Sequence, residues 1–306
     1  MKNDVLSRNI LLMDAARVLA EECFNRGIPV VFLKGAALLE LGIFKFPERE
    51  MTDIDVLIRK HERHAVEKTV LSMGFREMEN SSSAFVKTEN PFSPPVIIDV
   101  HADLRHLKNT DDFFKEAFSP DNALSHILVP STEDLFLHLA CHPLLHHGHL
   151  GDKAVRDAKK VLEWVSVNPV RNPPCPLGTA TAASGRLISN GVKGNLKFFM
   201  EQLVSKAEKH RLKPVVYPIL QELSLDVPEL KPGGFEAAKE RFFRNALHKH
   251  SAFMEYLLPV ILRPALALKY LFPEKEFLRK RYGRQSAWNV LIRPFQLLKN
   301  IFIRNL

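Results

Sequence analysis

The sequence predicts an α/β (α+β) domain followed by a mostly α-helical domain. Short apolar, β-branched runs such as residues 28–33 and 96–104 alternate with helical periodicity in the first third of the chain. The rest of the chain is helical in pattern, apart from one stretch rich in proline, glycine and serine. We therefore place the first domain at residues 1–126 and the second at 127–306, with a flexible insertion or linker at about 168–195.

Composition narrows the class of protein. The chain has 306 residues, of which 46% are hydrophobic and 25% charged, as is typical of globular proteins. Its three cysteines are far apart and include no Cys-x-x-Cys pair, which argues against a disulfide framework and a thiolate zinc site. We expect a cytoplasmic protein, and the N-terminal sequence has no signal-peptide pattern.

Positive charge is concentrated near the C-terminus. The net charge is +8, and residues 239–306 hold 14 Lys and Arg against four Glu. This region would suit an anionic partner such as nucleic acid, a membrane surface or an acidic protein, or it forms a solvated helical face. Residues 253–272 are apolar, but charges and prolines interrupt them. We therefore expect no transmembrane span, with peripheral membrane association as an open alternative.

The order of elements follows from apolar periodicity and from turn residues. In the first domain we expect helices at 3–26, 36–41 and 61–73, strands at 28–33, 53–58 and 96–104, and a hairpin of 75–78 with 84–88. In the second we expect helices at 131–143, 152–165, 197–210 and 236–258. Ser131 and Asp134 have the spacing of a capping box, and Pro143 should end or kink the helix that they begin.

A pair of aspartates marks the candidate site. Alternate side chains of a strand share a face, so Asp53 and Asp55 point one way, whereas Ile54 and Val56 point the other. The apolar pair can be buried, but two adjacent carboxylates repel each other and lose hydration unless a positive charge lies between them. Mg²⁺ suits such a pair because it prefers a few hard oxygen ligands.

Further polar residues surround this pair in the predicted fold. Asp99 and His101 share one face of another strand, so a third carboxylate and an imidazole are available. Lys34-Gly35 forms a turn between a strand and a helix, and Arg49 lies in the loop before the aspartates.

Taken together, these residues resemble the bacterial nucleotidyltransferase-like family of the DNA polymerase β superfold, in its uncharacterised nucleotidyltransferase group. The ordered motifs are Leu33-Lys34-Gly35, Arg49, Asp53-Ile54-Asp55 and Ile98-Asp99-Val100-His101. The helical half is similar at Pro130 to Leu135, His138, His142, Asp157, Leu271-Phe272-Pro273, Leu278-Arg279 and Arg281-Tyr282-Gly283. The chain departs from the superfold in having Lys34-Gly35 where a Gly-Ser pair would stand closer to the aspartates.

The resemblance implies a nucleotidyltransferase core with a mixed sheet. It also implies transfer of a nucleoside monophosphate from an NTP to an acceptor hydroxyl, with release of pyrophosphate. Asp53 and Asp55 would hold up to two Mg²⁺ ions, and Asp99 would complete the metal site and help to deprotonate the acceptor. The acceptor stays open between a small molecule, a protein and a tRNA.

The resemblance also implies roles for the neighbouring residues. Gly35 would let the backbone approach phosphate, and Lys34 or Arg49 would neutralise phosphate charge. Histidines would line the acceptor position or support the carboxylates: His101, His138 and His142.

Simpler interpretations stand beside these roles. Asp-x-Asp also occurs as a turn cap or at a solvated edge, and Lys34 would equally suit a solvated loop. Arg49 could pair with Glu48 or Asp53, and His101 could simply pack on its strand.

Two further alternatives concern function. The chain could bind nucleotide or a partner without catalysis. A row of histidines four residues apart would permit a zinc site, although Pro143 interrupts it, and core or site-lining roles are the other interpretation: His138, His142 and His146.

Overall fold

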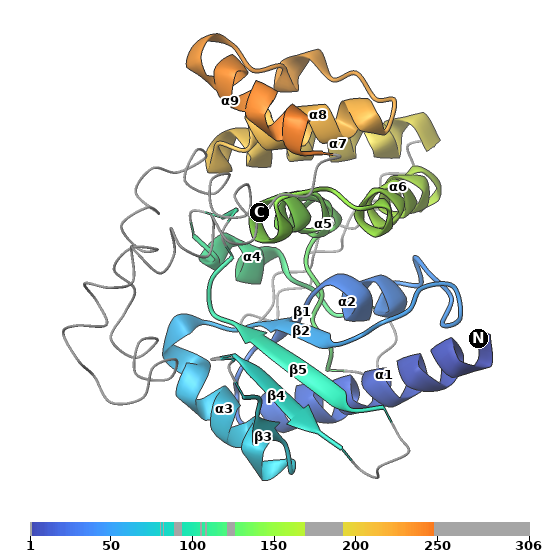
Figure 1. Ribbon diagram of the computed structural model, residues 1–306, viewed down its shortest axis with the longest axis vertical. Coiled ribbons are helices and arrows are strands. Elements are labelled where there is room, and N and C mark those ends of the chain that lie inside the picture. The colour runs from blue at the N-terminus through green and yellow to red at the C-terminus, as the bar shows by residue number, and fades with distance from the viewer. Residues whose placement is uncertain are drawn as a thin grey trace, which may run out of the picture. The chain divides into compact units, whose positions relative to one another are not determined.

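The computed structural model describes most of the first 247 residues (Figure 1). The described ranges are 2–79, 81, 83–88, 94–104, 106–107, 109–120, 126–168 and 192–247. Most of the predicted linker and the basic region from residue 248 onward lie outside them, whereas residues 192–195 belong to a helix.

The chain divides into two compact units. The first takes in Met1–Phe136 and Lys160–Glu201, and the second takes in Leu137–Lys159 and Gln202–Leu306. The predicted domain boundary at residue 126 stays a prediction.

A five-stranded mixed sheet forms the centre of the first unit. Its strands, in spatial order, are β1 Val31–Phe32, β2 Ile54–Leu57, β5 Val96–His101, β4 Ala84–Lys87 and β3 Arg76–Glu77. Strands β2 and β5 run parallel, while the other three neighbouring pairs are antiparallel. The mixed sheet and the hairpin of β3 with β4 confirm the predicted fold class.

Helices cover this sheet on both sides. They are α1 Lys2–Phe24, α2 Lys34–Glu40, α3 Arg63–Ser72, preceded by the 3₁₀ turn η1 Lys60–Glu62, and α4 Asp111–Glu116. Helix α1 packs against α3 and β5, and α2 packs against β2. Figure 1 shows α2 on one side of the sheet, with α1 and α3 on the other.

Side-chain alternation explains why β5 lies where it does. Val96, Ile98 and Val100 are buried on the face that α1 covers, whereas Asp99 and His101 are only partly buried on the opposite face. Close to these polar residues, α4 supplies apolar side chains to a cluster with β1 and β2: Val31, Leu33, Leu57, Leu104, Leu107, Phe113, Phe114 and Ala117. Along β2 and β5 the sheet therefore has one apolar face and one face on which polar groups interrupt the core.

The remaining helices confirm the predicted helical second part. They are α5 Thr132–His147, α6 Asp152–Val167, α7 Val192–His210, α8 Lys213–Glu222, the 3₁₀ turn η2 Pro228–Leu230 and α9 Gly234–Ala246. Ser131 caps the beginning of α5, since the Asp134 amide donates to Ser131 Oγ at 3.4 Å, and Ser131 Oγ donates to Asp134 Oδ2 at 2.8 Å. Pro143 does not end α5, which continues to His147.

Two helices were not expected from the sequence. Helix α4 is short, and α8 contains Pro214 and Pro218, so neither gives a clear periodic signal.

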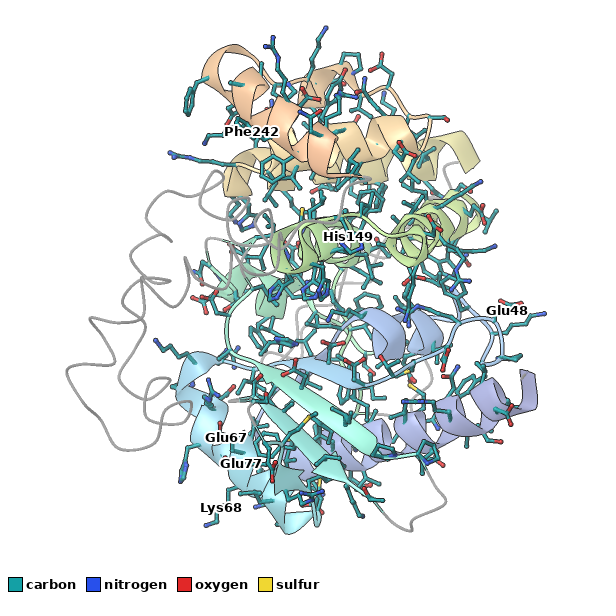
Figure 2. All side chains as sticks on the ribbon, in the orientation of Figure 1. Glu48, Glu67, Lys68, Glu77, His149 and Phe242 are labelled. Atoms are coloured by element: carbon teal, nitrogen blue, oxygen red, sulfur yellow. The ribbon has the colours of Figure 1, made fainter. Side chains whose placement is uncertain are left out.

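Within the described part of the chain, no helix is both long and apolar enough to cross a membrane. Helix α9 carries an exposed aromatic side chain at Phe242, labelled in Figure 2.

Candidate active site

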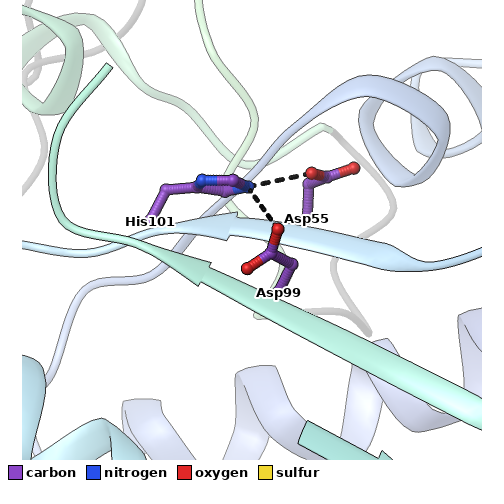
Figure 3. Close-up of side chains that lie close together, drawn as sticks. All are labelled: Asp55, Asp99 and His101. Carbon is purple, nitrogen blue, oxygen red and sulfur yellow. Dashed lines mark hydrogen bonds and ion pairs between the residues drawn. The ribbon is translucent and has the colours of Figure 1, made fainter. Parts of the chain in front are cut away.

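The register of the two parallel strands sets the site. Asp55 of β2 lies opposite Asp99 of β5, and Leu57 lies opposite His101. Because alternate residues share a face, Asp55, Asp99 and His101 point to the same side of the sheet, as Figure 3 shows. Asp53 comes just before β2 and is half-buried.

Asp55 is the most enclosed of these groups, with 3% of its side chain exposed. Its Oδ1 accepts a hydrogen bond from Lys34 Nζ at 2.6 Å and lies 2.9 Å from His101 Nε2. The same His101 nitrogen is 3.4 Å from Asp99 Oδ2. Ser83, at the start of the hairpin's second strand, donates to Asp99 Oδ1 at 2.6 Å. Three separate segments therefore contact the two carboxylates, and His101 is the residue among them that contacts both.

The pKa values of the two aspartates shift in opposite directions. Burial is the largest influence on Asp55 and would raise its pKa, but the hydrogen bond from His101 and the charge of Lys34 outweigh it and hold the pKa at about 2. Burial raises the pKa of Asp53, and the neighbouring charge of Asp55 raises it further. The protein thus favours the ionised form of Asp55 and disfavours the ionised form of Asp53.

The turn between β1 and α2 is strained at Lys34. Its backbone φ is +46°, a left-handed conformation that is unfavourable for residues with a Cβ. Gly35 beside it has no room for a side chain, since a Cβ there would lie 2.5 Å from Arg49 Nη1 and 2.7 Å from Met51 Cγ. Glycine is therefore required at position 35 because Arg49 approaches the backbone closely there, which the sequence alone did not show.

Arg49 itself is buried, with 5% of its surface exposed. Its neighbour Glu48 is exposed at the outer edge of the segment (Figure 2), where its Oε2 accepts the Lys45 amide at 3.1 Å. The segment is held from the other side by Asn9 of α1, which binds the backbone of Arg49 and Met51. Burial rules out a fully solvated Arg49, and a structural ion pair of Arg49 with Glu48 or Asp53 stays an alternative.

The donor set fits a divalent cation. Asp55, Asp99 and His101 offer ligand atoms that all lie within 4.8 Å of one another, and in the described part of the chain they are the one such group of three or more. Carboxylate oxygens suit Mg²⁺, and an imidazole nitrogen also suits Mn²⁺ and other first-row ions. Asp53 is a further carboxylate nearby, and because its pKa is raised, a bound cation would stabilise its ionised form.

The α5 histidines form a separate cluster. His138 and His142 are buried, with ring centroids 5.1 Å apart, and His142 stacks on His146 at 4.1 Å. They belong to the second unit, and their roles near an acceptor stay predictions. The rings of His138 and His142 are tilted and those of His142 and His146 are stacked. The described residues provide no set of three close ligand atoms here, so the zinc alternative gains no support.

Most of the predicted site residues meet in the first unit. Lys34, Asp55, Asp99 and His101 are joined by hydrogen bonds and ion pairs, and Asp53 lies within electrostatic reach of three of them: Lys34, Asp55 and Asp99. Sequence reasoning missed Asn9 and Ser83. Asn9 could have been noticed as a polar residue among the buried positions of an amphipathic helix, and Ser83 as the end of a serine run before a strand.

The segment that builds this site matches a known protein family. The model of the family described as uncharacterised nucleotidyltransferase matches residues 2–165, more than half of the 306 residues. The chain therefore belongs to this family, and its fold and class of enzyme are those of a nucleotidyltransferase. The family implies an NTP substrate and an acceptor.

Two solved structures of the antibiotic-resistance factor ANT(2'')-Ia also match. One is a solution structure, which covers 66% of this chain and 98% of that chain, and the other is a crystal structure with adenylyl-2''-tobramycin, which covers 62% and 97%. Both have 12% sequence identity and a TM-score of 0.36, a level too low to inform substrate or residue roles. No curated protein matches the sequence.

Proposed function

We propose that this nucleotidyltransferase transfers a nucleoside monophosphate from an NTP to a hydroxyl acceptor in an Mg²⁺-dependent reaction that releases pyrophosphate. One observation carries the proposal: the parallel register of β2 and β5 sets Asp55 opposite Asp99, and Asp53 lies just before β2. Carboxylates gathered in this way supply the oxygen ligands that a divalent cation prefers.

In this proposal, Asp53, Asp55 and Asp99 would hold the metal. When bound, Mg²⁺ would neutralise charge on the phosphates as the transfer proceeds. Lys34 already has its ammonium at Asp55 and so lies beside the position at which phosphate charge would enter. Arg49, buried against Gly35, would present a planar guanidinium that can bind phosphate oxygens in pairs.

The acceptor oxygen would attack the α-phosphorus, and the bond between that phosphorus and the β-phosphate bridging oxygen would break. The electron pair of the broken bond leaves with pyrophosphate, and the proton of the acceptor hydroxyl passes to the carboxylate of Asp99. His101, 3.4 Å from Asp99 Oδ2, and Ser83, bonded to Oδ1, would keep that carboxylate oriented.

Thermal shift with ATP, GTP, CTP and UTP in the presence of Mg²⁺ tests nucleotide binding. We expect at least one NTP to raise Tm, and Asp53→Asn to abolish the rise without unfolding the protein. Asp14→Asn, which makes the same chemical change at an exposed residue of α1, should leave the rise intact. Absence of a response to every NTP would rule out the proposal.

Catalysis needs a separate measurement. Pyrophosphate release should depend on Mg²⁺, on Asp99 and on an added acceptor from a panel of small hydroxyl compounds, proteins and tRNA. NTP binding without pyrophosphate release or label transfer would favour a non-catalytic nucleotide-binding protein. Incubation with α-³²P-labelled NTP and fractionated lysate would show which fraction becomes labelled and so identify the acceptor class.

A further inference from the structure

Asn9 is fully buried in α1, forty residues before the segment that it binds. Its Nδ2 donates hydrogen bonds to the carbonyl oxygens of Phe46 and Arg49, the latter at 2.7 Å. Its Oδ1 accepts the Met51 amide at 3.0 Å. One side chain therefore satisfies three backbone groups of a single short segment.

These bonds fall on both sides of the Arg49 side chain. The Arg49 carbonyl and the Met51 amide are fixed to α1, so the backbone there has little freedom to rotate. The side chains of Arg49 and Met51 meanwhile lie against Gly35, where a Cβ would not fit. The guanidinium is thus held between a fixed backbone and the beginning of α2.

We propose that Asn9 is a positioning residue for nucleotide binding, which holds residues 46–51 so that Arg49 presents its guanidinium to the triphosphate. This inference rests on the proposed function. Binding groups are effective when their own conformations are fixed by surrounding hydrogen bonds and packing, because less freedom is lost when the ligand binds. Asn9 supplies that support from outside the site.

The chemistry of the position favours asparagine. Two carbonyl oxygens need donors and one amide needs an acceptor, and a side-chain carboxamide offers both. An aspartate would keep the acceptor but set a carboxylate against two carbonyl oxygens. An alanine would leave all three backbone groups without this partner.

A purely structural role is the competing explanation, since any buried polar residue with three bonds stabilises the fold. The two explanations differ in how Asn9 depends on Arg49. If Asn9 acts through Arg49, its effect on nucleotide affinity disappears once the guanidinium is removed. If it only stabilises the fold, its effect on affinity is the same with or without Arg49.

A double-mutant cycle makes this test. The variants are Asn9→Ala, Asn9→Asp, Arg49→Met and Asn9→Ala with Arg49→Met. The probe is whichever of ATP, GTP, CTP and UTP the wild-type protein binds most tightly with Mg²⁺, measured by calorimetry. Val70→Ala, a buried change on α3, is the control for general loss of stability.

We expect Arg49→Met to weaken binding by about 10- to 100-fold, the range for charge-assisted hydrogen bonds, and Asn9→Ala to weaken it by about tenfold. In the Arg49→Met background, Asn9→Ala should change affinity by less than about twofold. Hydrogen exchange of residues 43–52 should rise in Asn9→Ala and Asn9→Asp, but not in Val70→Ala.

Equal effects of Asn9→Ala in both backgrounds would overturn the inference and leave the proposed function standing. So would an Asn9→Ala variant that loses stability like Val70→Ala but keeps wild-type affinity. Failure of the wild-type protein to bind any NTP is a different result, since it removes the proposed function and the role of Arg49 together.

Discussion

Asp53 and Asp55 are two residues apart and share one motif, yet their surroundings differ. Asp55 lies within β2, where Lys34 Nζ and His101 Nε2 both contact its Oδ1. Asp53 lies at the end of the preceding loop, where Thr52 Oγ1 donates a hydrogen bond to its carboxylate at 2.9 Å. The carboxylate within the strand thus has basic side chains in direct contact, whereas the described contact of the carboxylate at the loop end is with a neutral hydroxyl.

Because of this difference, the two carboxylates have opposite effects on the stability of the folded protein. Asp55 stabilises the folded protein without a metal, because the hydrogen bond from His101 and the charge of Lys34 offset its burial. Asp53 costs stability, because its burial and the charge of Asp55 raise its pKa. We therefore expect opposite effects on stability when each is neutralised, although both changes should harm nucleotide binding.

The largest effect should come from Asp55→Asn. Removal of the anion between Lys34 and His101 should lower the free energy of unfolding by about 2–4 kcal/mol at pH 7, since a broken buried pair leaves its partners uncompensated. Urea denaturation measures this. Because the folded pKa of Asp55 lies below that of an unfolded aspartate, its contribution is complete above about pH 4 and fades as pH falls toward 2. A wild-type advantage independent of pH would contradict this account.

Lys34 offers a second way to test the strand side of the comparison. Lys34→Ala should cost about 1–2 kcal/mol, because it removes a charge-assisted hydrogen bond of 2.6 Å from a partly exposed ammonium. Lys34→Gly removes the same ammonium but relieves the left-handed backbone, so it should be more stable than Lys34→Ala by about 1 kcal/mol. Urea midpoints of the two variants compare them directly, and equal midpoints would show that the backbone is not strained.

His101→Asn tests whether the imidazole belongs to the metal site. We expect the preference for Mn²⁺ over Mg²⁺ to fall by about tenfold, since the variant replaces a nitrogen ligand by a harder oxygen. Electron paramagnetic resonance of bound Mn²⁺, with Mg²⁺ as competitor and no nucleotide, gives the ratio. His64→Asn, at an exposed residue of α3, is the matched control. An unchanged ratio would limit His101 to hydrogen bonding.

The smallest effect should come from Asp53→Asn in the absence of metal. We expect a rise in Tm of about 2–4 °C at pH 7, because the variant removes a charge that the fold disfavours. The folded pKa lies above the unfolded one, so the advantage is complete above the folded pKa and disappears below about pH 4. Differential scanning calorimetry at several pH values measures this change in Tm. A lower Tm for the variant at pH 7 would show that ionised Asp53 stabilises the fold instead.

The sequence predicted much of the fold around the site. The apolar alternation of β2 and β5 was clear because both strands bury one whole face, and the carboxylates then had to share the other. Helix α8 was missed because its prolines obscure the helical pattern, and Pro143 was expected to end or kink α5, although that helix continues to His147. Proline signals a boundary locally, but packing can keep a helix going through it.

What the sequence determined by itself was the set of groups: three aspartates, a lysine, an arginine and a histidine at positions where strands and turns present them. It determined these because period and turn chemistry are local properties. The tertiary structure alone decided how the groups are paired. Lys34 and His101 make their direct contacts with Asp55, and Asn9 holds the backbone of Arg49 from a helix forty residues away. Such pairings depend on strand register and on long-range contacts, which neighbouring residues in the sequence do not encode.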